Sequence, residues 1–264
     1  MMTFPRFSVL IPAYNPDSSL CNLVNSLIRV FEYHKINVDY EFVLVNDGSF
    51  ADESAIIFSK LNALDMVKVI NLSHNQGKGA ALKEGLKYIK TTKSEYIVTA
   101  DADGQHLADD IFAVLKRSIS KCQFIIGVRD LYTKGTPLKS FLGNGLSSII
   151  FKIISKKDLP DTQSGLRAFP SKHIDRMLSI SGNLYQYELS VLLEFYKGAD
   201  NICDINKVYI DDNKRTSFRP IVDSIIVYSV FLRYCLNSFL ITILDFSIIY
   251  VMTKFYPTII VFIV

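Results

Sequence analysis

Two aspartates, spaced two residues apart, are the clearest candidates for chemistry in this sequence. Asp101 and Asp103 lie in the stretch TADADGQH, directly after the apolar run Tyr96–Thr99. In an extended backbone residues i and i+2 share a side, so the two carboxylates can converge on one target. A divalent cation with oxygen ligands would stabilise such a pair. A solvated Asp-Ala-Asp-Gly turn explains the same residues without a metal, so spacing alone leaves both interpretations open.

Two further polar clusters precede these aspartates. In VNDGS, Asp47 can hydrogen-bond the base or ribose of a nucleotide, but a strand-to-helix turn with Ser49 as the helix N-cap explains the same residues. In NQGKG, Lys78 lies between two glycines at the start of a predicted helix, as at an anion-binding helix end. The phosphate-loop pattern GxxxxGK[ST] is absent. Each cluster, taken alone, supports either a nucleotide site or an ordinary turn.

The elements that must position these residues follow from the pattern of apolar runs. Short apolar runs alternate with longer amphipathic stretches, which predicts an α/β fold with a buried, mostly parallel sheet. The predicted strands are Phe7–Ile11, Glu41–Val45, Val67–Asn71, Tyr96–Thr99, Phe124–Gly127 and, further along, Ile205–Ile210. The predicted helices are Ser18–Tyr33, Asp52–Leu61, Gly77–Lys90, Ala108–Ser120, Leu138–Ser155 and Tyr185–Tyr196. Ligands of open α/β sheets bind beyond the carboxyl ends of the strands, where the polar clusters fall.

The C-terminal part of the chain is apolar enough to enter a membrane. Tyr234–Thr253 is a run of 20 residues in which Asp245 is the only charged side chain. About 20 residues cross a hydrocarbon core, which predicts one transmembrane helix. The alternative is a pair of buried core helices, which Asp245 favours because a charge within a membrane span is costly. The final FYPTIIVFIV is too short to cross.

Composition excludes several classes of protein. A net charge of +3 over 264 residues, without a long basic run in the first two thirds of the chain, gives no reason to expect a nucleic-acid partner. The N-terminus has no secretory signal pattern, so the bulk of the chain is expected in the cytosol. The four cysteines are far apart, without ligand-like spacing, and are expected to be reduced thiols: Cys21, Cys122, Cys203 and Cys235.

Taken together and in order, FSVLIPAYN, VLVNDGS, NQGKGAALKEGL and TADADGQH resemble the successive signatures of family 2 glycosyltransferases with the GT-A fold. Within that family the chain is most similar to the polyprenyl-phosphate glycosyltransferases, such as dolichyl-phosphate mannose synthase and the bactoprenol glucosyltransferases. The resemblance implies a Rossmann-like catalytic domain over residues 1–218, with a mostly parallel sheet flanked by helices. It implies a juxtamembrane helix and a transmembrane segment over residues 219–264, which look like part of a GtrA-type membrane domain.

The resemblance implies a donor site for a nucleotide sugar. Asp101 and Asp103 match the DxD motif that binds Mg²⁺ or Mn²⁺, with Gln105 as a further ligand; His106 stays unassigned between ligand and bystander. The residues implied to bind the donor, from its base to its diphosphate, are Pro12, Ala13, Tyr14, Asp47, Lys78, Asp101 and Ala102.

Three later segments also resemble segments of the family, two of them on its acceptor side. Arg129 in GVR and Arg167 in DTQSGLR suit an acceptor phosphate, because a planar guanidinium holds two oxygens, although arginines that serve packing are as common. Asp161 matches a general base of relatives with hydroxyl acceptors; with a phosphate acceptor it would orient groups instead. Arg215 and Ser217 in RTSFRP would close over the diphosphate, or form a basic flank on anionic headgroups.

The implied activity is an inverting transfer of a sugar to a polyprenyl phosphate at the cell membrane, with the catalytic domain in the cytoplasm. UDP-glucose and undecaprenyl phosphate are the favoured substrates, and Asp103, Asp161 and Arg129 the expected catalytic residues. Two alternatives stay open: a family 2 transferase with a hydroxyl acceptor in cell-surface polysaccharide synthesis, and a non-catalytic membrane scaffold. The sequence also leaves a homo-oligomer open.

Overall fold

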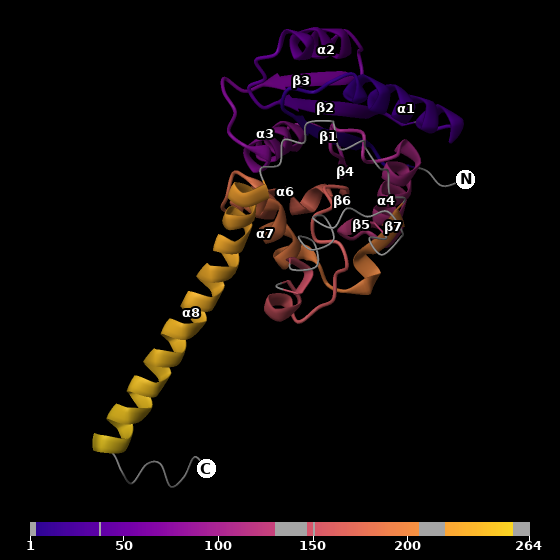
Figure 1. Cartoon of the computed structure of the whole chain (residues 1–264). Helices are drawn as coiled ribbons and strands as arrows, with labels where there is room; N and C mark the ends of the chain where they lie inside the picture. Colours follow the sequence, from indigo (N-terminus) through magenta and orange to yellow (C-terminus); the bar gives the residue numbers. More distant parts are fainter. Residues whose placement is uncertain (1–3, 37, 130–146, 150, 206–219, 256–264) are drawn as a thin grey trace, which may run out of the picture.

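The computed structural model describes residues 4–36, 38–129, 147–149, 151–205 and 220–255, the side chains of 185, 220–235 and 255 excepted. Within these residues, seven strands form one sheet in the order β3-β2-β1-β4-β6-β5-β7 (Figure 1). The strands are β1 (Phe7–Ala13), β2 (Tyr40–Asn46), β3 (Val67–Asn71), β4 (Tyr96–Thr99), β5 (Ile125–Arg129), β6 (Arg167–Pro170) and β7 (Ile202–Ile205). The α-helices are α1 (Ser19–Tyr33), α2 (Asp52–Asn62), α3 (Lys78–Lys90), α4 (Ala108–Lys121), α6 (Ile174–Ser179), α7 (Tyr185–Phe195) and α8 (Pro220–Phe255). There are also two short 3₁₀ turns, η1 (Ser171–His173) and η2 (Ala199–Asn201).

The predicted α/β sheet is confirmed, and its strands are mostly parallel. β3, β2, β1 and β4 run parallel to one another, and β5 runs parallel to β7. β6 lies between β4 and β5 and is antiparallel to both. The sequence pattern did not predict β6, because it has only four residues and no helix links it to a parallel neighbour. This one reversed strand therefore begins at the edge where the parallel strands end and runs back across the sheet.

Helices cover both faces of the sheet, so most strand residues are buried on both sides. The alternating side chains of β1 separate the two cores: Val9 and Ile11 pack with α1, α2 and α4, whereas Leu10 packs with α3 and α7. α1 illustrates the helical pattern, since its buried residues recur every three or four positions. They are Leu20, Leu23, Val24, Leu27 and Phe31.

Several predicted boundaries need correction. Ser49 is not the N-cap of α2; that position is Ala51. The last described strand, β7, begins at Ile202, three residues before the predicted Ile205–Ile210, most of which lies outside the described residues. The predicted helix Leu138–Ser155 is helical at residues 147–149 and 151–155, and the rest of it is outside the described part.

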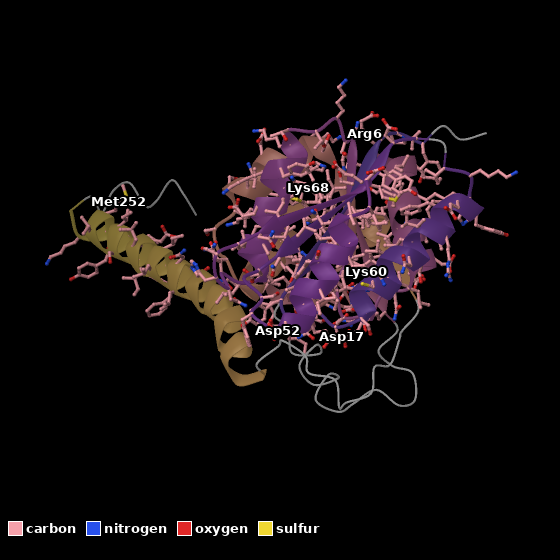
Figure 2. The ribbon with its side chains drawn as sticks, turned by 90° about the horizontal axis from the view of Figure 1, so that it is seen from above. Arg6, Asp17, Asp52, Lys60, Lys68 and Met252 are labelled. Carbon is pink, nitrogen blue, oxygen red and sulfur yellow. The ribbon has the colours of Figure 1, made fainter. Side chains whose placement is uncertain are left out.

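The C-terminal helix α8 extends away from the sheet (Figure 1). Its stretch Leu236–Lys254 is long and apolar enough to cross a membrane, and none of it is buried against the rest of the chain. Figure 2 shows Met252 near the end of α8 that is farther from the domain, and the side chains drawn on this part of α8 do not contact the domain. The alternative of buried core helices is therefore wrong for this stretch, and a membrane span remains the interpretation that its length and composition support.

The close packing of α3 on the sheet generates a stability prediction. Gly85 of α3 lies directly over Leu10, and a Cβ at this position would collide with the Leu10 side chain and crowd Val45. Gly85→Ala gains about 1 kcal/mol of helix propensity, but we expect overpacking to outweigh it and to lower the free energy of unfolding by about 1–3 kcal/mol. Urea unfolding of the detergent-solubilised chain measures this change. Lys87→Ala, at an exposed position of the same helix, is the control, and equal midpoints for both variants would contradict the packing argument.

Candidate active site at the carboxyl edge of the sheet

The fold gathers the predicted site residues at one edge of the sheet. The carboxyl ends of β1, β2, β4 and β5 lie together there, as parallel strands require. Because β6 is antiparallel, its first residue Arg167 pairs with Thr99 at the end of β4 and so reaches the same edge. Figure 2 shows this side near Asp17 and Asp52, opposite Arg6. The predicted residues at the ends of the parallel strands are Pro12, Ala13, Asp47, Asp101 and Arg129.

Lys78 joins two carboxylates at the centre of this edge. Its Nζ lies 2.6 Å from Oδ1 of Asp101 and 3.0 Å from Oε2 of Glu188. The imidazole Nε2 of His106 lies 3.3 Å from the other oxygen of Asp101. Burial raises the pKa of Asp101, but the positive charge of Lys78 and the contact with His106 outweigh it and hold this pKa far below its ordinary value. Asp101 is therefore ionised throughout the physiological pH range.

Asp103 has a different environment from Asp101, although it belongs to the same motif. It stays accessible to solvent, and its Oδ1 accepts a hydrogen bond of 3.0 Å from the main-chain N–H of Gln105. Desolvation and the nearby negative charge of Asp101 raise the pKa of Asp103. Among the described residues it forms no ion pair of its own. Asp103 thus carries the carboxylate whose charge is least compensated by the protein.

This charge distribution fits a divalent cation. Asp101, Asp103 and Gln105 offer carboxylate and amide oxygens, which are the donors that Mg²⁺ and Mn²⁺ take. No cluster of three or more His, Cys, Asp or Glu that could hold a metal occurs in the described part of the chain.

Arg129 and Asp161 form a second ion pair beside the first cluster. The Arg129 Nε and Nη2 donate to the two oxygens of Asp161 at 2.6 and 3.1 Å, a bidentate contact in which Asp161 is fully buried. Burial lowers the pKa of Arg129, but the hydrogen bonds and charge of Asp161 raise it above its usual value. Arg129 Nη1 also lies 3.4 Å from Oε1 of Gln105. Gln105 thus connects the Asp101–Asp103 motif to this pair.

Arg167 is buried below the edge rather than presented at its surface. Its Nη1 donates to the main-chain carbonyl of Glu188 at 2.7 Å, and its Nε donates to that of Ser164 at 3.2 Å. Burial lowers the pKa of Arg167, and the charge of Glu188 opposes this effect. In this arrangement Arg167 supports α7 and the turn before β6, and its contact with an acceptor phosphate stays a prediction.

Asp47 organises the loop that leads to Lys78. Its two carboxylate oxygens accept main-chain hydrogen bonds from Gln76 and Gly77, at 2.8 and 2.9 Å. Burial raises the pKa of Asp47, and these two hydrogen bonds act in the opposite direction. Gly48 has a φ of +68°, and a Cβ there would collide with the main chain of His74. The VNDGS turn is therefore packed against the NQGKG loop and fixes the start of α3.

Tyr14 follows β1 at the outer side of this turn. Its ring packs edge-on against Phe50, with 6.1 Å between ring centroids, and Phe50 is 79% exposed. Ser49, which is not a helix cap, uses its Oγ to accept the main-chain N–H of Asn15 at 2.8 Å. Two aromatic rings thus flank the turn that carries Asp47.

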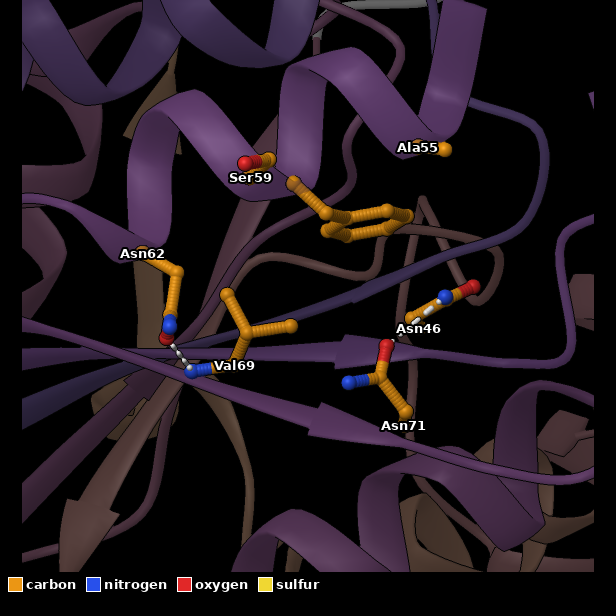
Figure 3. Close-up of a pocket in the computed structure, with 7 residues that line it drawn as sticks. Asn46, Ala55, Ser59, Asn62, Val69 and Asn71 are labelled. Carbon is orange, nitrogen blue, oxygen red and sulfur yellow. Dashed lines mark hydrogen bonds between the residues drawn. The ribbon is translucent and has the colours of Figure 1, made fainter. Parts of the chain in front are cut away.

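A pocket of about 310 Å³ lies beside the charged edge, between α2 and the strands β2 and β3 (Figure 3). At its mouth the side-chain amide of Asn46 donates to that of Asn71 at 2.9 Å. Its other lining residues are Ala55, Phe58, Ser59, Asn62 and Val69. None of the residues predicted for the site lines it, so this pocket is separate from the carboxylate cluster.

Two residues of the site were missed by sequence reasoning. Glu188 is the partner of both Lys78 and Arg167, and its only signal was a charge among apolar residues in YQYELSVLLEF. Gly165 lies against Asp101, and a Cβ there would fall 2.5 Å from the carboxylate Oδ1. Arg215 and Ser217 lie outside the described residues.

The architecture is an α/β fold with a charged site at the carboxyl edge of a mostly parallel sheet. Residues 8–175, more than half of the chain, match the glycosyl transferase family 2 domain. The chain belongs to glycosyl transferase family 2. The GT-A fold expected from the sequence is confirmed by solved structures at low sequence identity. Glucosyl-3-phosphoglycerate synthase of Mycobacterium tuberculosis, in complex with Mn²⁺, UDP-glucose and phosphoglyceric acid, superposes with a TM-score of 0.64 at 16% identity, over 88% of this chain and 80% of that one.

Curated relatives include sugar transferases named for a dolichyl-phosphate acceptor. UDP-N-acetylglucosamine–dolichyl-phosphate N-acetylglucosaminyltransferase of Methanococcus voltae is 33% identical over 68% of this chain and 75% of its own length. Dolichyl-phosphate beta-glucosyltransferase of Mus musculus is 27% identical over 65% of this chain and 59% of its own. The putative glycosyltransferase CsbB of Bacillus subtilis is 30% identical over 71% of this chain and 55% of its own. The chain thus spans little more than half the length of the last two.

The buried contacts of Asp47 generate a second stability prediction. Asp47→Asn replaces one acceptor oxygen by an NH₂ group, which would face the N–H of Gln76 or Gly77 and leave it unpaired. We expect the free energy of unfolding to fall by about 1–3 kcal/mol. Urea unfolding of detergent-solubilised protein measures it, with the exposed Asp65→Asn as control. A loss no larger than that of the control would show that the loop does not depend on this carboxylate.

Proposed function

We propose that this protein transfers a sugar from a nucleotide sugar to a polyprenyl phosphate at the cytosolic face of a membrane. The observation that carries this proposal is the pair of adjoining clusters at the carboxyl edge: Lys78 with Asp101 and Asp103, and Arg129 with Asp161, connected through Gln105. UDP-glucose is the favoured donor and undecaprenyl phosphate the favoured acceptor. The names of the dolichyl-phosphate relatives support a polyprenyl-phosphate acceptor.

The donor would occupy the β1, β2 and β4 side of the edge. Tyr14 and Asp47 would border the space for the base and ribose. Main-chain atoms and small side chains would lie beside this space, from Pro12, Ala13 and Ala102. Lys78, held at the start of α3, places a positive charge next to the diphosphate. Charge that develops on a leaving diphosphate is stabilised by groups already fixed in position, which is what the contacts of Lys78 with two carboxylates provide.

Asp101, Asp103 and Gln105 are the residues that would hold Mg²⁺ or Mn²⁺. When bound, such a cation neutralises negative charge on the departing nucleoside diphosphate. Glu188 and His106 keep Lys78 and Asp101 in place, so that Asp103 and Gln105 remain the groups with spare oxygen donors. Arg215 and Ser217, in the RTSFRP segment, are proposed to close over the diphosphate.

The acceptor phosphate would bind beside Arg129. In the reaction, an oxygen of that phosphate forms a bond to the anomeric carbon of the sugar while the bond from this carbon to the diphosphate breaks, with inversion. A hydroxyl acceptor would need a general base, whereas a phosphate is already an anion. Both oxygens of Asp161 are engaged by Arg129, which favours an orienting role for Asp161 and hence a phosphate acceptor.

A transfer assay tests the acceptor and the metal together. The detergent-solubilised chain is incubated with purified undecaprenyl phosphate and radiolabelled nucleotide sugars, with and without EDTA. We expect label in the organic phase after chloroform extraction with UDP-glucose, and none when EDTA is present. No extractable label with any donor would overturn the lipid acceptor and favour the hydroxyl-acceptor or scaffold alternatives. Label that persists in EDTA would overturn the metal.

The accessible aspartate of the motif generates a matched pair of variants. Asp103→Ala should abolish transfer, because it removes the carboxylate least compensated by the protein, while the thermal unfolding midpoint stays close to that of the wild type. Asp109→Ala, at an exposed position in the first turn of α4, is the control and should retain activity. Initial rates with the radiolabelled donor measure both. Wild-type turnover by Asp103→Ala would contradict the assigned role.

A further inference from the structure

A helical segment that lies between Arg129 and Asp161 in the sequence exposes an apolar surface. In the helical residues 147–149 and 151–155, Ile149 and Ile153 are 59% and 63% exposed. They are four positions apart and therefore share one face of the helix. Phe151 points the other way, is fully buried, and packs edge-on against Tyr196. The segment is thus anchored in the core and turns an apolar face outward.

Lysines border this apolar face. Lys152 and Lys156 are exposed, whereas the Nζ of Lys157 donates to the main-chain carbonyl of Tyr196 at 2.9 Å. The helix stops at Lys156, whose φ of +56° ends the regular backbone there. Asp158 is the one acidic residue among residues 147–158, and it pairs with Lys152 at 2.8 Å. Because Lys152 is paired with Asp158, Lys156 contributes the remaining positive charge beside the apolar face.

This surface lies on the side of the catalytic domain toward which α8 extends. Figure 1 shows the segment at the end of the catalytic domain toward which α8 runs, and α2 at the opposite end. The stretch Leu236–Lys254 of α8 is the candidate membrane span. A bilayer crossed by that stretch would therefore lie on the same side of the domain as the helical segment of residues 147–149 and 151–155.

We propose that Ile149, Ile153 and the lysines around them form a second membrane contact, which rests on the surface of an anionic bilayer. Isoleucines enter the boundary between headgroups and acyl chains, while lysines extend to anionic headgroups. The inference rests on the membrane location proposed above. Single exposed apolar residues are common on soluble proteins; here two on one face combine with a basic border and with the direction of α8.

This contact would connect the bilayer to the acceptor side of the site. The Ser148 hydroxyl donates to the main-chain carbonyl of Pro160 at 3.1 Å, and Pro160 directly precedes Asp161, the partner of Arg129. Leu159 is buried in the same core as Phe151. The membrane-facing segment and the proposed phosphate site thus belong to one packed unit. Contact of the segment with the bilayer would therefore fix the distance between the phosphate site and the lipid phosphates.

The absence of tryptophan from the chain allows a direct test. Ile153→Trp introduces a single tryptophan at the proposed contact, and Ile56→Trp introduces one on α2, where Ile56 is 69% exposed. Each full-length variant is reconstituted into vesicles of phosphatidylglycerol and phosphatidylethanolamine, with and without brominated acyl chains. We expect the fluorescence of Trp at 153 to shift to shorter wavelength and to be lost with brominated lipid, while Trp at 56 is unaffected.

The outcomes separate this inference from the proposed function. If the protein floats with the vesicles but Trp at 153 responds like Trp at 56, the second contact is overturned while anchoring by α8 stands. If neither variant floats, membrane location fails and the contact fails with it. A wavelength shift in detergent without lipid, which grows with protein concentration, would assign the face to a second copy of the chain and overturn the lipid assignment.

A functional measurement adds an independent readout. Ile153→Ser should raise KM for undecaprenyl phosphate in vesicles and leave kcat unchanged, because chemistry is intact and only docking is weakened. With a water-soluble, short-chain polyprenyl phosphate the variant should match the wild type. An equal loss with both acceptors would overturn the docking role and show that the substitution disturbs the site itself.

Discussion

The excess of negative charge at the carboxyl edge of the sheet is the constraint on which the rest of this structure depends. Among the described residues, the carboxylates of Asp101, Asp103, Asp161 and Glu188 lie together there, and they are accompanied by the cations of Lys78, Arg129 and Arg167. Like charges in a partly desolvated edge raise one another's pKa unless cations are fixed nearby. The protein places its cations so that Asp101 and Asp161 are compensated and Asp103 is not. That imbalance makes this edge suited to a divalent cation and a diphosphate.

Holding the cations in place requires much of the fold. Lys78 is fixed because Asp47 binds the two N–H groups before it, and because Glu188 approaches from α7. Glu188 is in turn held by the buried Arg167, whose own position follows from the reversed strand β6. Elements distant in sequence thus support one ammonium group. Rigid support of this kind is what electrostatic stabilisation of a leaving group needs, since groups that must first reorganise contribute less.

For the proposed transfer to a polyprenyl phosphate, a membrane would be the second constraint on the molecule. A chain that binds a soluble donor at one end of its site and a lipid phosphate at the other must hold the site at a fixed distance from the bilayer. α8 alone would leave the domain free to tilt about one attachment. A second contact near Ile153, in the same packed unit as Asp161, would limit that freedom.

Periodicity in the sequence was enough to determine the parallel half of the sheet. β3 and β4 begin and end where the apolar runs do, and β1, β2 and β5 are longer than predicted or shifted by one or two residues. The order of the motifs was likewise enough to indicate the glycosyl transferase family and the GT-A fold. These features are local, because a strand buried on both faces must be apolar and a strand end that meets solvent must be polar.

Only the tertiary structure decided which charges meet. The sequence TADADGQH does not distinguish Asp101 from Asp103. In the structure, Lys78 and His106 contact Asp101, whereas Asp103 stays accessible to solvent. The sequence likewise predicts a phosphate contact for both Arg129 and Arg167. In the structure, Arg129 pairs with Asp161 at the edge, whereas Arg167 is buried under Glu188. Pairing energies depend on separation and desolvation across strands far apart in the chain, and spacing along the sequence carries neither quantity.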